Sequence, residues 1–380
     1  MHEYLTSSIN SPISLYIHIP FCTKKCPYCA FYKESYDKNL EKKFITALCN
    51  EIISYKVYNI RLKSIFFGGG TPSKLSAISF KKIFSILNQT FQLSVNTECT
   101  IECNPEDITT KNLQLFETLP INRLSLGIQS FNEDELKFLG RTHSLKQLHH
   151  ALSLLKNSSI TNFNLDLMYG LPISTLTHLN FSLSQCLIYK PTHISTYCLS
   201  IENGTQFEKK NILPLHSFIE ADHYLYIKKT LTKQNYQHYE VSAFAQKGFT
   251  CTHNLSYWQF EPYLGIGPSA HSFLFPYRFQ NKSSLKKYLQ NPNPAWTHTK
   301  INKSKKNHLV LEFFCSTLRL YQGCNLEYFK KIFNSLPTKE ILLKLKLMEK
   351  SGLLTLKNNK LKCTPKGMLL LNEILLNLTD

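Results

Sequence analysis

The sequence predicts an α/β protein in which six strand–helix units form an open or partial barrel, with a smaller α+β region after them. Over the first 200 residues, apolar segments of strand length alternate with amphipathic segments of helical length. That pattern is typical of successive βαβ units and a parallel sheet. Beyond residue 200 the alternation fades. Six units are fewer than the eight that close a full barrel, so we expect a partial one.

The expected elements follow one another in a regular order. Strands are expected at 15–19, 64–67, 98–102, 123–128, 162–167 and 193–197. Amphipathic helices are expected between them at 40–53, 80–87, 145–155 and 176–188. Later in the chain, helices are expected at 216–233 and 325–350, and a hairpin at 352–366 with its turn near Asn358-Asn359. This helix followed by a hairpin resembles a winged helix.

In the third, fourth and fifth expected strands, apolar residues alternate with polar ones. Side chains of a strand alternate between its two faces, and a parallel strand packed on both faces would be almost entirely apolar. The polar faces therefore indicate an interior that binds something polar, unless the sheet has one hydrated face. Glu102, Gln129 and Asp166 lie at or near the C-terminal ends of their strands, where barrel enzymes place their active sites.

We expect three regions in the chain. The first is a core barrel at 1–205, the second an extension at 206–300, and the third a C-terminal domain at 301–380. The first boundary falls where the alternation ends. The second lies in a Pro-, Asn- and Lys-rich stretch near 290–305.

Composition excludes several classes of protein. Hydrophobic residues make up 43% of the chain, a larger fraction than disordered proteins contain. No apolar run approaches the ~18 residues of a membrane span, and the N-terminus has neither the basic start nor the apolar stretch of a signal peptide. We therefore expect a cytoplasmic protein. In a reducing compartment, its 12 cysteines would be core residues or metal ligands.

Three of these cysteines lie within eight residues, directly after the first expected strand. Cys22, Cys26 and Cys29 have the spacing CxxxCxxC. Three thiolates on one loop can each bind one iron of a 4Fe–4S cluster and leave the fourth iron open to a small molecule. A zinc site is the alternative. It needs a fourth ligand, and His18 lies on the strand before the loop.

A second motif, GGGTP at 68–72, follows the second expected strand. Consecutive glycines let backbone amides approach a ligand without an intervening Cβ, although most glycine turns are only tight turns. The position at the C-terminal end of a barrel strand favours a ligand-binding role.

These two motifs together resemble the radical S-adenosylmethionine (SAM) superfamily. Further segments narrow the resemblance to the oxygen-independent coproporphyrinogen oxidase group and, within it, to the HemW branch. They are YIHIPFCTKKCPYC, FFGGGTPS, IECNPEDIT, NRLSLGIQSFNEDELKFLGRTHS, NLDLMYGLP, HISTYCLSIENGT and HNLSYWQFEPYLGIGPSAHSF. The resemblance extends from about residue 14 to about residue 375.

The resemblance implies that Cys22, Cys26 and Cys29 hold the cluster and that SAM binds its open iron. Nine residues at matching motif positions would contact SAM: Tyr16, Tyr28, Gly69, Gly70, Thr71, Glu102, Gln129, Arg141 and Asp166. The two carboxylates can accept hydrogen bonds from ammonium or ribose hydroxyl groups. Arg141 can hold a carboxylate as a fork, unless it forms only a surface ion pair.

One position separates the branches of this group. The true oxidases carry a further cysteine two residues after the third ligand, whereas this chain has Cys29-Ala30-Phe31. The missing cysteine argues against coproporphyrinogen decarboxylation. Proteins of the HemW branch typically have an acidic residue where Ala30 stands, so the chain departs from its own branch there. We expect little effect on the cluster, because Ala30 is not a ligand.

The segment HNLSYW matches an HNxxYW motif that is characteristic of the HemW branch and associated with heme. His253 could be an axial iron ligand, with Asn254 beside it, while Tyr257 and Trp258 offer flat apolar surface. The alternative is a histidine and two aromatic rings packed at a domain contact. Cys251 could also bind iron, although a lone cysteine is more often a buried core residue.

The resemblance implies a heme chaperone that binds the cluster, SAM and heme and delivers heme to heme-requiring proteins. Membrane-associated respiratory proteins are possible recipients, and a flavodoxin or ferredoxin would supply electrons. The alternatives are an oxygen-independent coproporphyrinogen III oxidase and a radical SAM enzyme of heme breakdown. The complete set of SAM motifs leaves enzymatic activity open. The net charge of +18 suits an anionic membrane or an acidic partner unless it only solvates the surface, and nucleic acid is not expected.

Overall fold

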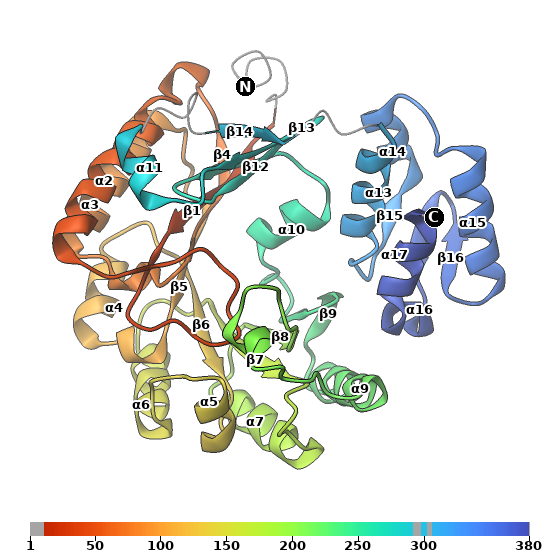
Figure 1. Cartoon of the computed structure of the whole chain (residues 1–380), viewed down its shortest axis with the longest axis horizontal. Helices are drawn as coiled ribbons and strands as arrows, with labels where there is room; N and C mark the ends of the chain where they lie inside the picture. Colours follow the sequence, from red (N-terminus) through yellow and green to blue (C-terminus); the bar gives the residue numbers. More distant parts are fainter. Residues whose placement is uncertain (1–10, 292–297, 302–305, 380) are drawn as a thin grey trace.

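The computed structural model describes residues 11–291, 298–301 and 306–379. Its main body is a twelve-stranded sheet with parallel strands at the centre and helices packed around the outside (Figure 1). A smaller unit of helices and a three-stranded sheet forms the C-terminal end of the chain. The predicted α/β fold with a partial barrel and a smaller second unit is confirmed.

The six expected strands form the parallel centre of the large sheet, and each lies between neighbours in the expected order. They are β1 (Ile13–Ile19), β4 (Leu62–Gly69), β5 (Glu98–Cys103), β6 (Arg123–Gln129), β7 (Phe163–Tyr169) and β8 (His193–Cys198). Their apolar faces pack against the surrounding helices as one core, in which Leu124, Leu126 and Ile128 are fully buried.

Six helices connect these strands. They are α2 (Lys38–Ile53), α3 (Ala77–Thr90), α4 (Thr110–Glu117), α5 (Glu133–Phe138), α6 (Leu145–Lys156) and α7 (Leu176–Ile188). Each begins after an Asp, Asn, Ser or Thr whose side chain accepts a hydrogen bond from the first turn, which is the favoured N-cap chemistry. The four expected helices are confirmed. The short helices α4 and α5 were not predicted, because so few turns produce no clear period.

The extension adds strands to both edges of the same sheet. On one side β11 (Tyr263–Ile266) pairs in parallel with β1, followed by β12 (His271–Leu274), β13 (Tyr277–Asn281) and β14 (His298–Ile301). On the other, β10 (Ala243–Ala245) and β9 (Gln237–Glu240) continue from β8. These strands have three to five residues, too few for an alternating pattern to stand out in the sequence. The expected domain boundaries stay a prediction, and part of the stretch near 290–305 lies outside the described residues.

Three further helices belong to the extension, and two of them are short. They are α8 (Gln206–Lys209), α9 (Ser217–Lys233), which confirms the helix expected at 216–233, and α11 (Leu285–Gln290). A fourth, α10 (Thr252–Trp258), contains the HNLSYW segment and packs against β1, β4 and α13 (Lys306–Thr317). Figure 1 shows α10 between the barrel strands and the C-terminal unit.

A buried carboxyl group joins the extension to the barrel. Glu51 on α2 accepts hydrogen bonds from the Tyr288 hydroxyl (2.5 Å), the Asn281 amide (2.7 Å) and the Gly267 backbone N–H (2.9 Å). Burial raises the pKa of Glu51 to about 7, although these three donors favour the ionised form. Because its partners come from three segments of the extension, Glu51 fixes β11 to β13 against the outer helices.

The C-terminal unit shares an apolar core with Tyr224, Phe260 and Phe273 of the extension, and its helices correct one prediction. The helix expected at 325–350 is two helices, α14 (Leu326–Phe333) and α15 (Lys339–Lys350). Asn334 adopts a left-handed conformation (φ 50°) and ends α14, and Thr338 caps α15 after Pro337. The expected hairpin is confirmed as β16 (Leu354–Lys357) and β17 (Lys360–Cys363).

The turn of that hairpin and the last elements follow from local chemistry. Asn358 and Asn359 both have positive φ, as a two-residue type I′ turn requires. The unit is completed by β15 (Cys324–Asn325), α16 (Pro365–Leu369) and α17 (Leu371–Thr379). Its winged-helix resemblance stays a prediction. Within the part of the chain that the structure describes, no helix combines the length and apolar character needed to cross a bilayer.

Candidate functional site

A cavity of about 730 Å³ lies inside the parallel part of the sheet. Its volume is in the range of cofactor and small-molecule sites. Fifteen of the sixteen residues selected from the sequence line it: Tyr16, Cys22, Cys26, Tyr28, Cys29, Gly69, Gly70, Thr71, Glu102, Gln129, Arg141, Asp166, His253, Asn254 and Tyr257. The polar faces of the strands thus point inward, and the hydrated-face alternative does not apply to them. Trp258 is not among the lining residues.

The three clustered cysteines line the cavity from the loop that follows the C-terminal end of β1. A short parallel pairing of β2 (Phe21–Cys22) with β3 (Glu34–Ser35) joins the two ends of the loop. Inside it, the Cys29 N–H donates to the Cys26 carbonyl (3.2 Å), which forms a tight turn. All three thiols are unpaired and half-buried, so one loop presents three sulfur atoms to one cavity.

A hydrogen-bond chain links two of these thiols through residues that are distant in sequence. The Thr71 hydroxyl donates to Cys22 Sγ (3.7 Å), and the Asn104 amide donates to Thr71 Oγ1 (3.3 Å). Arg141 completes the chain, because Nη2 donates to Asn104 Oδ1 (2.6 Å) and Nη1 donates to Cys26 Sγ (3.6 Å). Burial raises the pKa of the Cys22 thiol, and the hydrogen bond from Thr71 opposes that rise by favouring the thiolate.

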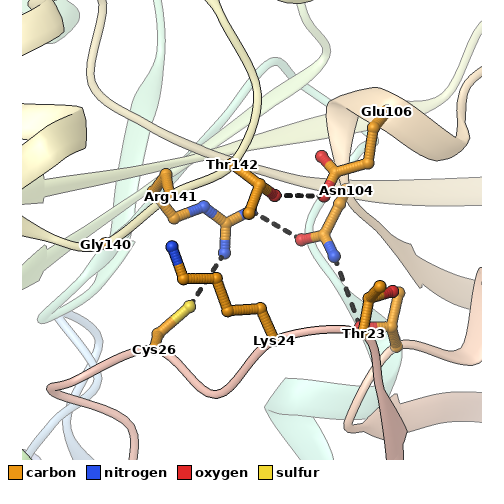
Figure 2. Close-up of a pocket in the computed structure, with 9 residues that line it drawn as sticks. Thr23, Lys24, Cys26, Asn104, Glu106, Gly140, Arg141 and Thr142 are labelled. Atoms are coloured by element: carbon orange, nitrogen blue, oxygen red, sulfur yellow. Dashed lines mark hydrogen bonds between the residues drawn. The ribbon is translucent and has the colours of Figure 1, made fainter. Parts of the chain in front are cut away.

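A second, smaller pocket adjoins this chain (Figure 2). It shares Cys26, Asn104 and Arg141 with the main cavity. Figure 2 shows the Arg141 guanidinium between Cys26 and Asn104, with Lys24 extending beneath it. Another wall of the pocket is formed by Glu106, which accepts a hydrogen bond from the Thr142 hydroxyl (2.9 Å). Arg141 is therefore a half-buried hydrogen-bond partner of the loop, and the surface ion pair considered from the sequence is not formed among the described residues.

The glycine segment packs directly against the cysteine loop. The Gly70 and Thr71 N–H groups donate to the Ile19 and Phe21 carbonyls (2.8 and 2.7 Å). Gly69 has a φ of 111°, and a Cβ placed there would lie 2.5 Å from the His18 ring. The positive φ and the close His18 ring require glycine at position 69 for the fold alone, as the tight-turn interpretation expects, and the ligand-binding interpretation stays a prediction.

Burial favours the protonated form of the two inward carboxyl groups, Glu102 and Asp166. Burial raises the pKa of Glu102 to about 8, and the nearby charge of Asp166 adds to the rise, against one hydrogen bond from the Gly69 N–H (3.1 Å). Burial also raises the pKa of Asp166, although Asn164 (2.7 Å) and Ser125 (3.2 Å) donate to its oxygens. A cationic ligand in the cavity would favour ionisation of both groups.

Two features of β6 were not recognised in the sequence. Gln129 has a φ of 66° after an irregular step in the pairing with β7, which turns its side chain into the cavity. Arg123 lines the cavity while only 2% exposed, and its Nε has no hydrogen-bond partner among the described residues. Arg123 occupies the polar face of its strand, so the alternation that selected Gln129 was also the signal for Arg123.

Helix α10 forms the floor of the cavity, at the opposite end from the cysteine loop. Glu98 accepts hydrogen bonds from the Thr252 and His253 N–H groups (both 2.9 Å) and so holds the start of the helix. His253 is 1% exposed, stacks on Phe66 with ring centroids 4.9 Å apart, and has both ring nitrogens hydrogen-bonded. This geometry is that of the packed-histidine alternative, so binding of iron would require one of those hydrogen bonds to break.

Two residues near His253 in the sequence, Trp258 and Cys251, do not line the cavity. Trp258 lies under the guanidinium of Arg319, 5.1 Å from the centre of its ring, at the contact with the C-terminal unit. Cys251 is fully buried and its thiol donates to Glu98 (3.5 Å), outside the cavity, so its assignment as a possible iron ligand is not supported by its position.

Phe31, where the oxidases carry a further cysteine, is 69% exposed at the edge of the cavity.

Comparisons with known proteins agree with this arrangement. A family model described as the radical SAM superfamily matches residues 16–181, and one described as the HemN C-terminal domain matches residues 305–370. The heme chaperone HemW of Haemophilus influenzae is 35% identical over 96% of this chain and 97% of its own length. The heme chaperone HemW of Lactococcus lactis is 35% identical over 86% of each protein.

A solved structure shares the fold. The radical SAM enzyme coproporphyrinogen III oxidase (HemN) from Escherichia coli superposes with a TM-score of 0.85 over 99% of this chain and 92% of that one, at 22% identity. The fold alone does not distinguish the members of this superfamily. The 35% identity with the Haemophilus influenzae protein, over nearly the whole length of both chains, supports a narrower family assignment. The chain belongs to the HemW family of the radical SAM superfamily.

Proposed function

We propose that this chain is a heme chaperone that holds a 4Fe–4S cluster on Cys22, Cys26 and Cys29, binds SAM beside it, and passes heme to heme-requiring proteins. The observation that carries the proposal is the convergence of three free thiols and nine candidate SAM contacts on one cavity of about 730 Å³. The residues fit both groups: soft sulfur ligands for iron, and buried carboxyl groups with backbone N–H donors for a zwitterionic, cationic molecule.

The roles of the chain in such a site follow from its contacts. When bound, the reduced cluster and SAM supply one-electron cleavage chemistry. Thr71 and Arg141 hold the thiolates through hydrogen bonds to sulfur. Glu102 and Asp166 would accept hydrogen bonds from ligand N–H or O–H groups.

Phe31 favours chaperone function over decarboxylation. The oxidase alternative expects a thiol at this position, and Phe31 offers an exposed apolar ring instead. Twelve free thiols suit a reducing compartment such as the cytoplasm. We further propose that a small acidic electron carrier reduces the cluster, and that heme recipients include membrane-associated respiratory proteins, because a chain with a net charge of +18 is attracted to acidic proteins and anionic membranes.

Two anaerobic assays test this proposal on the reconstituted protein. With SAM, a reductant and coproporphyrinogen III, we expect no protoporphyrinogen IX, while the Escherichia coli oxidase forms it under the same conditions. With heme, we expect the protein to bind heme and then to transfer it to an apo-cytochrome. The change in the absorption spectrum of the cytochrome measures the transfer. Steady formation of protoporphyrinogen IX would show that the chain is an oxidase, and heme binding without transfer would make it a heme-binding protein of another kind.

Binding of SAM is expected to release a proton near pH 7. The Glu102 carboxyl, with its pKa raised to about 8, is protonated in the free protein, and a cationic ligand favours the carboxylate. The affinity for SAM should therefore rise as the pH increases from 6 to 8, by up to about tenfold per pH unit. Calorimetric titration in two buffers of different protonation enthalpy measures the released proton.

The variant Glu102→Gln should remove both the proton release and most of this pH dependence. Glu106→Gln is a matched control, because burial opposes ionisation there but the nearby His143 ring (3.6 Å) and the hydrogen bond from Thr142 lower the pKa of Glu106 to about 2. Glu106 is thus ionised throughout this pH range, and its replacement should leave the pH dependence intact. An unchanged pH dependence in Glu102→Gln would mean that another group takes up the proton.

A further inference from the structure

Five side chains form a buried hydrogen-bond chain under the floor of the cavity. The Tyr257 hydroxyl contacts His253 Nε2 (2.8 Å), and His253 Nδ1 contacts the Ser64 hydroxyl (3.0 Å). The chain continues from Ser64 to Ser14 (2.7 Å) and from Ser14 to Ser256 (2.7 Å). It joins β1, β4 and α10, and among its members only Tyr257 faces the cavity with an appreciably exposed surface.

The last hydrogen bond of this series, at Ser256, determines which atom is the donor in each of the others. The Ser256 hydroxyl donates to the Thr252 carbonyl (3.0 Å), an oxygen that can only accept. Ser256 must then accept from Ser14, and Ser14 from Ser64, since each hydroxyl has one proton to donate. Ser64 therefore accepts from His253 Nδ1. The imidazole carries its proton on Nδ1 and has its lone pair on Nε2, where it accepts the proton of the Tyr257 hydroxyl.

Nε2 is thus the nitrogen of His253 that has a lone pair for a metal, and Tyr257 occupies it. Resting on the proposed function, we infer that Tyr257 is a latch on His253: heme iron reaches Nε2 only when the Tyr257 hydroxyl turns away into the cavity. The imidazole itself is held in place by Ser64 and by the Phe66 ring. Burial lowers the pKa of His253 to about 3, with the charges of Lys63 and Arg123 acting in the same direction, so the ring stays neutral and keeps this lone pair.

The side chain of Tyr257 can move at modest cost. It is partly exposed to the cavity, and it packs edge-on against the Tyr263 ring, 4.5 Å between centroids. Opening the latch breaks one neutral hydrogen bond, which is worth about 0.5–1.5 kcal/mol net, besides edge-on ring contacts with Tyr263 and His253 that Tyr257→Phe retains. Removal of the hydroxyl should therefore increase the rate of heme binding through His253 by about three- to tenfold.

The test is a stopped-flow titration with ferric heme, followed by its absorption and electron paramagnetic resonance spectra, on the full-length protein. We expect Tyr257→Phe to bind heme three- to tenfold faster than the unmodified protein, with the same histidine-ligated spectrum. Tyr263→Phe is the matched control, because its hydroxyl contacts Arg278 (3.2 Å) rather than His253. Its heme-binding rate should be unchanged. In the His253→Gln background, Tyr257→Phe should have no effect.

A second readout does not involve heme. ¹⁵N spectra of histidine-labelled protein should show the signal that is lost in His253→Gln as an Nδ1–H tautomer, and Tyr257→Phe should shift only its Nε2 resonance. An Nε2–H tautomer would overturn the inference.

The outcomes separate the latch from the heme site. If His253→Gln binds heme with an unchanged spectrum, His253 is not the ligand, and that part of the proposed function fails together with the latch. If His253→Gln loses the histidine-ligated spectrum but Tyr257→Phe binds heme at the original rate, the heme site stands and the latch alone is wrong. Equal acceleration by Tyr263→Phe would also contradict it, since it would indicate general loosening of the floor.

Discussion

Replacement of Cys26 by alanine is expected to abolish the 4Fe–4S cluster. In the proposed site three thiolates would hold three of the four irons, so the loss of one would leave two irons without a protein ligand. Arg141, whose Nη1 donates to Cys26 Sγ, would lose its sulfur partner as well. After anaerobic reconstitution with iron and sulfide, iron per chain should fall from about four to near zero.

Cys198→Ala is the matched control for this experiment. Cys198 also lines the cavity and is half-buried, but it lies at the end of β8 and is not part of the CxxxCxxC loop. Burial raises the pKa of its thiol to about 12, which disfavours the thiolate that iron requires. This variant should keep its full iron content. Loss of the cluster in Cys198→Ala would mean that four thiolates hold it and no iron is open to SAM, and a full cluster in Cys26→Ala would contradict the assignment of the loop.

Gly69→Ala is expected to destabilise the protein and weaken SAM binding together. A non-glycine residue at a φ of 111° is strained by roughly 1–3 kcal/mol. The added methyl would also lie 2.5 Å from the His18 ring, and overpacking costs a further 1–3 kcal/mol or so. The ring cannot easily move, because the Tyr16 hydroxyl (3.1 Å) and the Tyr32 carbonyl (2.9 Å) hold its two nitrogens. Denaturant unfolding and calorimetric titration with SAM measure the two effects.

A second glycine isolates the contact with His18. Gly204 also has a positive φ (81°), but nothing lies within 4 Å of a Cβ placed there. Gly204→Ala should therefore show the backbone strain alone and leave SAM affinity unchanged. If both variants lose the same free energy of unfolding, the close packing of the glycine segment against β1 does not contribute to stability.

Much of the fold was predictable because it depends on short-range order. The six central strands and four main helices are long enough for a period of two or of 3.6 to be read directly. The polar faces that selected Glu102 and Asp166 are also a local property, since alternate residues of any strand share a face. The cysteine spacing and the glycine run are local in the same sense, and both lie where the motifs placed them.

Two other features of the structure were not predicted from the sequence, each for a specific physical reason. The break between α14 and α15 depends on the left-handed conformation of Asn334. The residue type alone did not predict that conformation. Trp258 was grouped with Tyr257, although adjacent residues on a helix point about 100° apart and cannot share a face. Tyr257 accordingly faces the cavity while Trp258 packs under Arg319.

The sequence by itself determined the order of the elements, the clustering of three cysteines on one loop and the inward polar face, because each rests on residues close together in the chain. Only the tertiary structure decided what those residues do to one another. Cys22 and Cys26 are linked through Asn104 and Arg141, and His253 is hydrogen-bonded to Ser64, 189 positions away. Such partners meet through strand pairing across the whole sheet, and the burial that shifts their pKa values and occupies their lone pairs exists only once the sheet is assembled.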